Sequence, residues 1–99
     1  MAEGRKTYRF GRSARADLRS SVFWYEEKRA GLGARFAAEV RRAIDLIVLA
    51  PHRWPIRRGT HRYVLRRFPY TIAYRFTADE VTILAVAHHR LDPGSWESR

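Results

Sequence analysis

The chain has 99 residues, enough for one hydrophobic core, so we expect a single domain over residues 1–99 with an ordered core from about residue 8 to residue 96. It contains no cysteine, which excludes disulfides and thiolate metal sites, and no apolar run as long as a membrane span or signal peptide, so we expect a cytoplasmic protein without a membrane partner. The net charge of +10, carried by 18 arginines and two lysines, calls instead for an acidic partner.

The first predicted elements are a short strand and a helix. Residues 8–10 form a strand pattern, and Ser13 is a suitable N-cap for a helix over residues 14–30. The stripe that should face the core consists of Ala14, Leu18, Val22 and Tyr25. Phe23 and Trp24 lie outside this stripe, so we expect either a terminal segment or a partner to cover their apolar area.

A second helix has the most regular pattern in the chain. The turn Gly31-Leu32-Gly33 reverses the chain and Pro51 ends the helix, so the two helices are predicted to form an antiparallel hairpin. Its buried stripe is predicted to consist of Leu32, Phe36, Val40, Ala43, Ile44 and Ile47. Its solvent-facing side is predicted to carry Arg35, Glu39, Arg41, Arg42 and Asp45. Each helix has one apolar stripe, so both can cover only one face of a sheet.

The second half of the chain predicts a sheet. Residues 52–59 indicate a loop anchored by Trp54, and residues 62–67 alternate as a strand that carries cations. Residues 70–76 alternate with a period of two, and residues 81–87 are apolar on both faces, as is typical of a central strand. The order strand, helix, helix, strand, strand, strand predicts an α+β fold. In it an antiparallel two-helix hairpin packs on one face of a small, mostly antiparallel β-sheet.

Arginine is concentrated in the second half of the chain. No acidic residue occurs between Asp45 and Asp79, and the arginines in this interval suit recognition of phosphate or carboxylate groups through the planar guanidinium. The predicted target-binding residues are Arg57, Arg58, Arg62, Arg66, Arg90 and Trp96. The alternative is a general composition bias with solvated arginines.

Several kinds of catalytic site are excluded by the sequence. It has no glycine-rich phosphate loop, no HExxH motif and no spaced cluster of metal ligands, so no metal and no cofactor is expected. His88 and His89 are adjacent on a strand, so their side chains should point to opposite faces and cannot both bind one ion. No serine or cysteine is set with a paired base for nucleophilic catalysis.

A series of short segments gives the chain a resemblance to a known family. The segments are Asp17-Leu18, Gly31-Leu32-Gly33 with Phe36, Pro51, Arg66-Arg67-Phe68-Pro69-Tyr70 with Ile72 and Tyr74, and Ile83-Leu84-Ala85-Val86-Ala87-His88 with Arg90, Pro93 and Trp96. From about Tyr8 to Trp96 the sequence resembles the RelE/ParE superfamily of toxins from type II toxin–antitoxin pairs. The resemblance implies the same fold and a cognate acidic antitoxin that folds on binding and forms a hetero-oligomer with the toxin. Phe23 and Trp24 are then the candidate antitoxin-binding residues.

The superfamily divides by target. The segments FPYxIxY and AVAHxRxDPxxW are more similar to the ParE-type branch, whose members poison DNA gyrase, so the resemblance implies a growth-inhibiting toxin directed at gyrase. Members that resemble RelE instead cut messenger RNA on the ribosome without metal. On that alternative the catalytic candidates are Arg66, His88, His89 and Arg90. The tail holds Ser95 or Trp96 where that branch is expected to have a tyrosine, and the histidines would have to act as acid and base.

A third alternative is a small basic nucleic-acid-binding module. It would use exposed arginines interleaved with stacking aromatic rings. The aromatic candidates are Tyr63, Tyr70 and Trp96. Tyr70 lies in the apolar register of its strand and is predicted to be a core residue, which favours the toxin interpretations.

Overall fold

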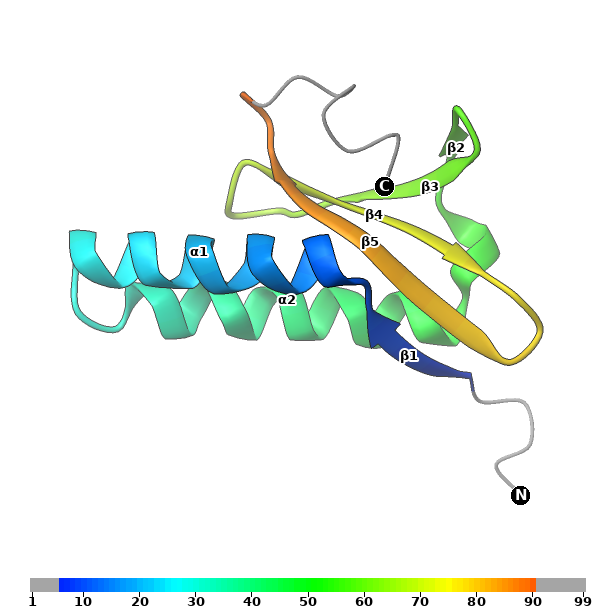
Figure 1. Cartoon of the computed structure of the whole chain (residues 1–99), viewed down its shortest axis with the longest axis horizontal. Coiled ribbons are helices and arrows are strands. Elements are labelled where there is room, and N and C mark those ends of the chain that lie inside the picture. The colour runs from blue at the N-terminus through cyan, green and yellow to red at the C-terminus, as the bar shows by residue number, and fades with distance from the viewer. Residues whose placement is uncertain (1–5, 91–99) are drawn as a thin grey trace.

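The computed structural model describes residues 6–90 as two long helices packed on one sheet. In chain order the elements are β1 (Thr7–Phe10), α1 (Arg12–Lys28), α2 (Leu32–Leu49), the 3₁₀ helix η1 (Pro51–Arg53), β2 (Ile56–Arg57), β3 (Thr60–Val64), β4 (Tyr70–Phe76) and β5 (Glu80–His88). Figure 1 shows α1 and α2 as an antiparallel layer on one side of the sheet. The predicted α+β architecture is confirmed.

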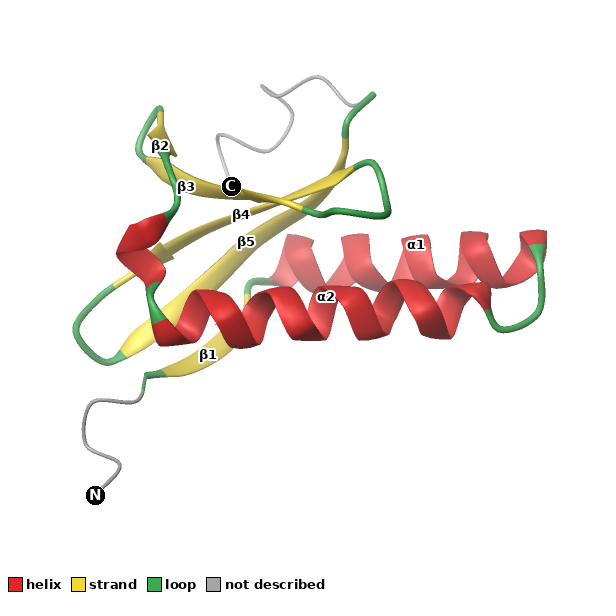
Figure 2. Cartoon of the chain, turned by 180° about the vertical axis from the view of Figure 1, so that it is seen from behind, coloured by secondary structure: helices red, strands yellow, loops and turns green. Residues whose placement is uncertain are grey.

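The five strands form one sheet in the order β1-β5-β4-β3-β2. β1 runs parallel to β5, and every other neighbouring pair is antiparallel. The apolar pattern of residues 81–87 had predicted that β5 is the central strand. The middle strand is instead β4, although β5 is internal, between β1 and β4. Figure 2 shows the same arrangement from behind, with β1 next to α2 and with β2 and β3 farther from the helices.

A β-bulge in β5 changes which residues of this apolar strand face the helices. One step along β4, from Ala73 to Tyr74, corresponds to two steps along β5, from Ala85 to Ile83, so Leu84 has no partner on β4. An inserted residue shifts the alternation of side chains. The helix-side core includes Ile83 and Val86, whereas Ala73, Ala85 and Ala87 form a separate buried cluster. The predicted burial of both faces is confirmed, but the bulge was not predicted.

Helix α1 begins two residues earlier than predicted. The N-cap residue is Gly11, and Ser13 lies inside the first turn of the helix Arg12–Lys28, where it makes no capping bond. The Gly11 N–H donates to the Ile83 carbonyl at 2.8 Å, and a Cβ on Gly11 would lie 3.2 Å from that oxygen. The corner between β1 and α1 is therefore held by the sheet and not by a serine hydroxyl.

The predicted glycine turn joins the two helices and is closed by a glutamate. Gly31 has a φ of 89°, which glycine adopts without steric cost. The Glu26 carboxylate accepts hydrogen bonds from the Gly31 N–H at 2.9 Å and the Gly33 N–H at 3.0 Å. A Cβ on Gly33 would lie 2.5 Å from the Val22 carbonyl oxygen. The two glycines are thus needed for different reasons, one for backbone conformation and one for close helix contact.

The apolar stripes of both helices face the sheet as predicted. Buried members include Ala14, Tyr25, Phe36, Val40, Ala43, Ile44 and Ile47, and Leu18, Val22 and Leu32 pack against them half-buried. Glu39 is the exception on α2, because only 9% of it is exposed, so its predicted place on the solvated face was wrong. Its position directly before Val40 puts it at the border of the stripe, where backbone N–H groups of the sheet layer supply partners.

The basic strand is shorter and earlier than predicted. β3 covers Thr60–Val64 instead of residues 62–67, and Leu65 is buried in the loop that follows, where its N–H donates to the Tyr70 carbonyl at 2.9 Å. Arg66 therefore lies in a loop and not on a strand. The predicted loop over residues 52–59 contains the two-residue strand β2, which pairs with β3.

Candidate functional site

The β2–β3 hairpin carries three of the arginines predicted to bind the target. Arg58 and Gly59 connect the strands with φ values of 51° and 85°, and Arg57 pairs with Thr60 across the turn. Two adjacent residues with positive φ are typical of a type I′ turn, whose twist matches that of the strands. The Arg62 Nη2 donates to the Arg57 carbonyl at 3.2 Å, and the Arg57 and Arg58 side chains are exposed. The hairpin therefore fixes its own backbone and presents Arg57 and Arg58 to solvent, whereas Arg62 is half-buried.

Aromatic rings attach this hairpin to the rest of the sheet. The Trp54 ring packs edge-on against Tyr63 with centroids 4.9 Å apart, which confirms Trp54 as the predicted anchor. The His61 ring stacks on Tyr74 at 5.3 Å, and its Nδ1 donates to the Trp54 carbonyl at 2.7 Å. The Tyr74 hydroxyl donates to the Pro51 carbonyl at 2.6 Å, and burial raises the pKa of Tyr74 to about 12. His61 and Tyr74 thus have structural roles.

Arg66 and Arg67 lie in the β3–β4 loop, at the opposite end of β3 from the hairpin turn. Both of their backbone N–H groups donate to the Glu39 Oε2, each at 2.9 Å. Both side chains are exposed. One buried carboxylate of α2 therefore holds the loop backbone while two guanidinium groups remain on the surface.

The end of β5 lies at the same end of the sheet. His88 packs edge-on against the Tyr70 ring at 5.1 Å, and its Nδ1 accepts a hydrogen bond from the Arg90 N–H at 3.0 Å. His89 faces the other side, where its Nε2 lies 3.1 Å from the Thr71 Oγ1. The predicted opposite orientation of the two histidines is confirmed. Tyr70 is also buried, as its strand register predicted.

A hollow of about 430 Å³ separates α1 from the end of β5. Its lining residues are Trp24, Tyr25, Pro69, His88, His89 and Arg90. Trp24 is 53% exposed; its ring packs edge-on against Tyr25 at 5.0 Å, and the Lys28 Nζ lies 4.7 Å from the ring centroid. Phe23 is 66% exposed. The two candidate antitoxin-binding residues are therefore both accessible, and Trp24 borders a basic hollow.

The structure places the predicted target-binding arginines in two groups. Arg57, Arg58 and Arg62 belong to the β2–β3 hairpin, and Arg66 and Arg90 lie at the opposite end of β3. The four candidates of the nuclease alternative, Arg66, His88, His89 and Arg90, share this second end. The two histidines bond partners on different faces of the sheet, although both border the hollow beside Trp24. Trp96 and Ser95 lie outside the described residues.

Two carboxylates bind backbone N–H groups of β5 and of the β3–β4 loop, near the second arginine group, and the sequence analysis missed both roles. The Asp17 Oδ2 accepts a hydrogen bond from the Val86 N–H at 3.1 Å, beyond the last residue of β5 that pairs with β1. Glu39 does the same for the β3–β4 loop. Each acid comes directly before an apolar stripe residue, Leu18 or Val40, and that adjacency is the signal that could have found them.

Metal-binding clusters and membrane-spanning helices are two further features that residues 6–90 do not contain. No group of three or more side chains that could hold a metal ion comes together in this part of the chain. None of its helices has the length and apolar character that crossing a membrane requires.

Comparison with known proteins then identifies the family. The family model described as the ParE toxin of the type II toxin–antitoxin system parDE matches residues 8–93. The chain belongs to the ParE toxin family. A solved structure described as the chromosomal ParDE TA system from P. aeruginosa has the same fold, with a TM-score of 0.73 and 17% sequence identity over 86% of this chain and 96% of that chain. No match was found among curated protein sequences.

Membership of the ParE toxin family confirms the resemblance found in the sequence and favours its ParE branch. The family model ends at residue 93, so it covers both arginine groups. In this ParE-family toxin the surface features are therefore two arginine groups, exposed except for the half-buried Arg62, a hollow beside Trp24 and the exposed ring of Phe23.

Proposed function

We propose that this ParE-family toxin inhibits DNA gyrase in the cytoplasm, and that a cognate acidic antitoxin neutralises it. The observation that carries the proposal is the match of the ParE toxin model to residues 8–93. The two arginine groups support it, because a segregated positive surface favours an acidic binding surface and speeds association with it. The five residues of β3 span about 15 Å, so the two groups can contact a large target at two separate points.

The arginine groups would act by binding, without breaking a bond. A guanidinium can donate two parallel hydrogen bonds to a carboxylate or phosphate, which fixes orientation as well as affinity. Glu39 holds only the backbone of Arg66, so the Arg66 side chain can be replaced without removing that support. We expect loss of Arg66 and Arg90 together to abolish toxicity, and His89→Ala to reduce it moderately, because no proton transfer is involved.

The test is to assay the purified toxin in parallel against gyrase supercoiling and against mRNA on programmed ribosomes. We expect inhibited supercoiling and intact mRNA. The double variant Arg66→Gln, Arg90→Gln should lose the inhibition, while Arg35→Gln, at an exposed position on α2, should keep it. Ribosome-dependent mRNA cleavage with undiminished supercoiling would overturn the proposal. It would favour the nuclease alternative, in which a single alanine variant at His88 or His89 loses about 10²–10⁴ in rate.

The antitoxin part of the proposal has its own test. Phe23 and Trp24 are exposed aromatic rings on α1, and burying such rings is a common source of binding energy. Phe23→Ala and Trp24→Ala should each weaken binding of the cognate antitoxin while the toxin stays folded. Binding as tight as that of the wild type by both variants would remove these residues from the interface.

A further inference from the structure

The outer side of α1 carries a row of three arginines. Arg12, Arg15 and Arg19 are all exposed. Their spacing of three and four residues places them along one side of the helix, and the buried residues Ala14 and Tyr25 lie on another side. This row is termed the α1 arginine stripe. Figure 1 shows that its end of α1 lies beside β1, whereas the turn between α1 and α2 lies at the far end of the helical hairpin.

The α1 arginine stripe lowers the stability of the helix that carries it. Arg12 is the first residue of α1, and the first turn contains no acidic residue. A cation is unfavourable at the positive, N-terminal end of a helix, and like charges three or four residues apart repel each other. Within the part of the chain that the structure describes, no hydrogen bond or ion pair of the three guanidinium groups offsets this repulsion. Residues that oppose local stability without a structural gain are typical of a binding surface.

The surroundings of the stripe favour a partner that is held by charge. The exposed side chains beside it, Ala16 and Ser20, are small, so a partner can reach the guanidinium groups without obstruction. Protein interfaces are usually centred on large apolar or aromatic residues. The first exposed residue of that kind on α1 is Phe23, one turn beyond Arg19. The stripe therefore offers three cations without an apolar anchor between them.

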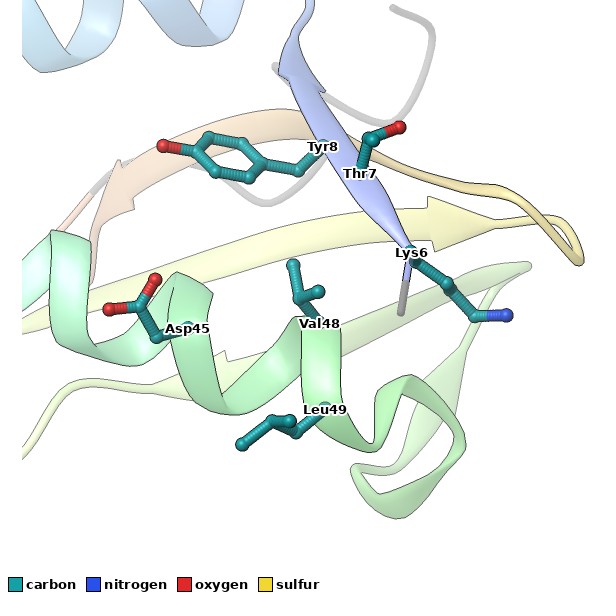
Figure 3. A pocket seen from close by; sticks show the side chains of 6 residues that line it. All are labelled: Lys6, Thr7, Tyr8, Asp45, Val48 and Leu49. Atoms are coloured by element: carbon teal, nitrogen blue, oxygen red, sulfur yellow. The ribbon is translucent and has the colours of Figure 1, made fainter. Parts of the chain in front are cut away.

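The hollow between β1 and α2 has the opposite character. It encloses about 560 Å³, and Tyr8, Val48 and Leu49 supply apolar parts of its lining (Figure 3). One cation, Lys6, and one carboxylate, Asp45, also border it. None of the described residues of α1 lines this hollow. The α1 arginine stripe is therefore a separate surface, with charge as its main feature.

The length of the stripe matches the spacing of phosphate groups in DNA. A helix rises about 1.5 Å per residue, so Arg12 and Arg19 are about 10.5 Å apart along the axis of α1. Each strand of a DNA duplex carries one phosphate per about 3.4 Å of duplex length, so the stripe covers about three phosphate intervals. A guanidinium can also donate two parallel hydrogen bonds to one phosphate. Three arginines in this row can thus contact phosphates of a single strand.

We propose that the α1 arginine stripe binds the phosphate backbone of duplex DNA. The inference goes beyond the proposed function, because inhibition of gyrase does not require the toxin itself to hold DNA. Gyrase acts on duplex DNA, so a toxin that also binds DNA would be retained where its target works. Phosphate contacts carry no sequence information, so the affinity should depend steeply on salt and little on base sequence.

The experiment measures binding of the full-length toxin to a short labelled DNA duplex by fluorescence anisotropy, over a series of salt concentrations. The stripe variant carries Arg12→Gln, Arg15→Gln and Arg19→Gln. It should bind DNA about 10- to 100-fold more weakly than the wild type at low salt. The slope of log affinity against log salt should become shallower by about 2–3, because each lost phosphate contact removes about 0.9 from it.

A control variant removes the same charge from the far end of the helical hairpin. Its three substitutions are at exposed positions and are Lys28→Gln, Arg29→Gln and Arg35→Gln. The control should bind DNA within about threefold of the wild type and change the salt slope by less than about one, because these cations would contact no phosphate. Equal losses by the two triple variants would mean that net charge alone sets the affinity, which overturns the inference.

Thermal melting separates a binding role from a structural one. The stripe variant should melt at or above the temperature of the wild type, because repulsion along α1 and at its first turn is removed. A lower melting temperature would assign the three arginines a structural role and overturn the inference.

The remaining outcomes separate this inference from the proposed function. If the stripe variant binds DNA like the wild type but binds the cognate acidic antitoxin more weakly, the stripe contacts an acidic protein and the inference is overturned. A loss of DNA binding confined to the stripe variant supports the inference, whether or not the wild-type toxin inhibits gyrase. Undiminished supercoiling in the presence of the wild-type toxin would overturn the proposed function alone.

Discussion

The two edges of the sheet differ in what they can bind. The β1 edge points the backbone groups of Tyr8 and Phe10 outward beside an apolar groove. The β2 edge is only two residues long, and the carbonyl of Arg57 accepts hydrogen bonds from the Thr60 hydroxyl and the Arg62 guanidinium. Short, charged edge strands resist pairing with other chains, whereas longer open ones invite it. One small sheet can therefore offer a strand edge to one partner and a cationic hairpin to another.

Each helix is joined to a different part of the sheet layer by one carboxylate, α1 to β5 and α2 to the β3–β4 loop. Asp17 of α1 accepts from the Val86 N–H, where β5 has continued past the end of β1. Glu39 of α2 accepts from two loop amides next to the arginine-rich end of β3. Both acids lie where the strand ladder leaves N–H groups without a neighbouring strand. Buried N–H groups need such acceptors, so each of these two residues joins its helix to the sheet layer through backbone hydrogen bonds.

The largest expected loss of stability comes from replacing Ile83, a core residue that lies between β1 and β4. Ile83 is fully buried, pairs with Phe10 on β1 and lies opposite Tyr74 on β4. Ile83→Ala should lower the free energy of unfolding by about 2–5 kcal/mol, because burial is lost and a cavity remains. Arg41→Ala, at an exposed position on α2, should cost less than about 0.5 kcal/mol. Urea denaturation of both variants measures the difference, and similar losses would contradict the assigned core.

Removing the carboxylate of Glu39 should disturb the β3–β4 loop and leave the β1 edge unchanged. Glu39→Ala leaves the N–H groups of Arg66 and Arg67 without their acceptor and should cost about 1–3 kcal/mol. Glu39→Gln keeps an acceptor oxygen and should cost less. Hydrogen exchange should become faster at Arg66 and Arg67 in the alanine variant, with little change at Tyr8. Equal acceleration at Tyr8 and in the β3–β4 loop would mean that the β1 edge and this loop are not independent.

Local patterns in the sequence predicted the faces of the elements better than their ends. The stripe from Phe36 to Ile47 and the alternation over residues 70–76 were sufficient to predict which face of each element is buried, because burial repeats with the geometry of a helix or strand. The bulge at Leu84 and the role of Glu39 depend on partners far away in the chain, which periodicity does not report. The strand β2 is only two residues long, too short to show any period.

In the candidate site, too, local spacing predicted where side chains point but not where elements end. The position of Phe23 and Trp24 outside the core stripe was predicted from helical spacing, and the opposite orientation of His88 and His89 was predicted from strand alternation. The separation of the arginines into two groups was not, since it depends on where β3 begins and ends. Arg66 looked like a strand residue because its neighbours alternate, but the Glu39 carboxylate holds it in a loop instead.

Alkaline pH should weaken the packing beneath the β2–β3 hairpin. Burial raises the pKa of Tyr74 to about 12, whereas the phenol in an unfolded chain has a pKa of about 10. The unfolded state loses its proton first, so the stability present below pH 10 falls as the pH rises toward 12. By pH 11 the loss should be about 1.4 kcal/mol.

Urea denaturation at pH 9 and pH 11 measures this loss. Tyr74→Phe should show a smaller decrease between the two values, with some decrease left because burial also raises the pKa of Tyr25. A decrease of the same size in the phenylalanine variant would assign the alkaline sensitivity to other groups.

The smallest expected loss of stability comes from two glycine substitutions, one in the β2–β3 hairpin and one in the turn between α1 and α2. Gly59 and Gly31 have φ values of 85° and 89°, and a Cβ built on either meets no atom within 4 Å. Gly59→Ala and Gly31→Ala should therefore each cost about 1 kcal/mol through backbone conformation alone. The two variants are matched in stability, so thermal melting should not separate them. Gyrase inhibition should separate them, because only Gly59→Ala changes the turn that presents Arg57 and Arg58. Equal inhibition by the two variants would remove the β2–β3 hairpin from the gyrase contact and leave Arg66 and Arg90 as the arginines that make it.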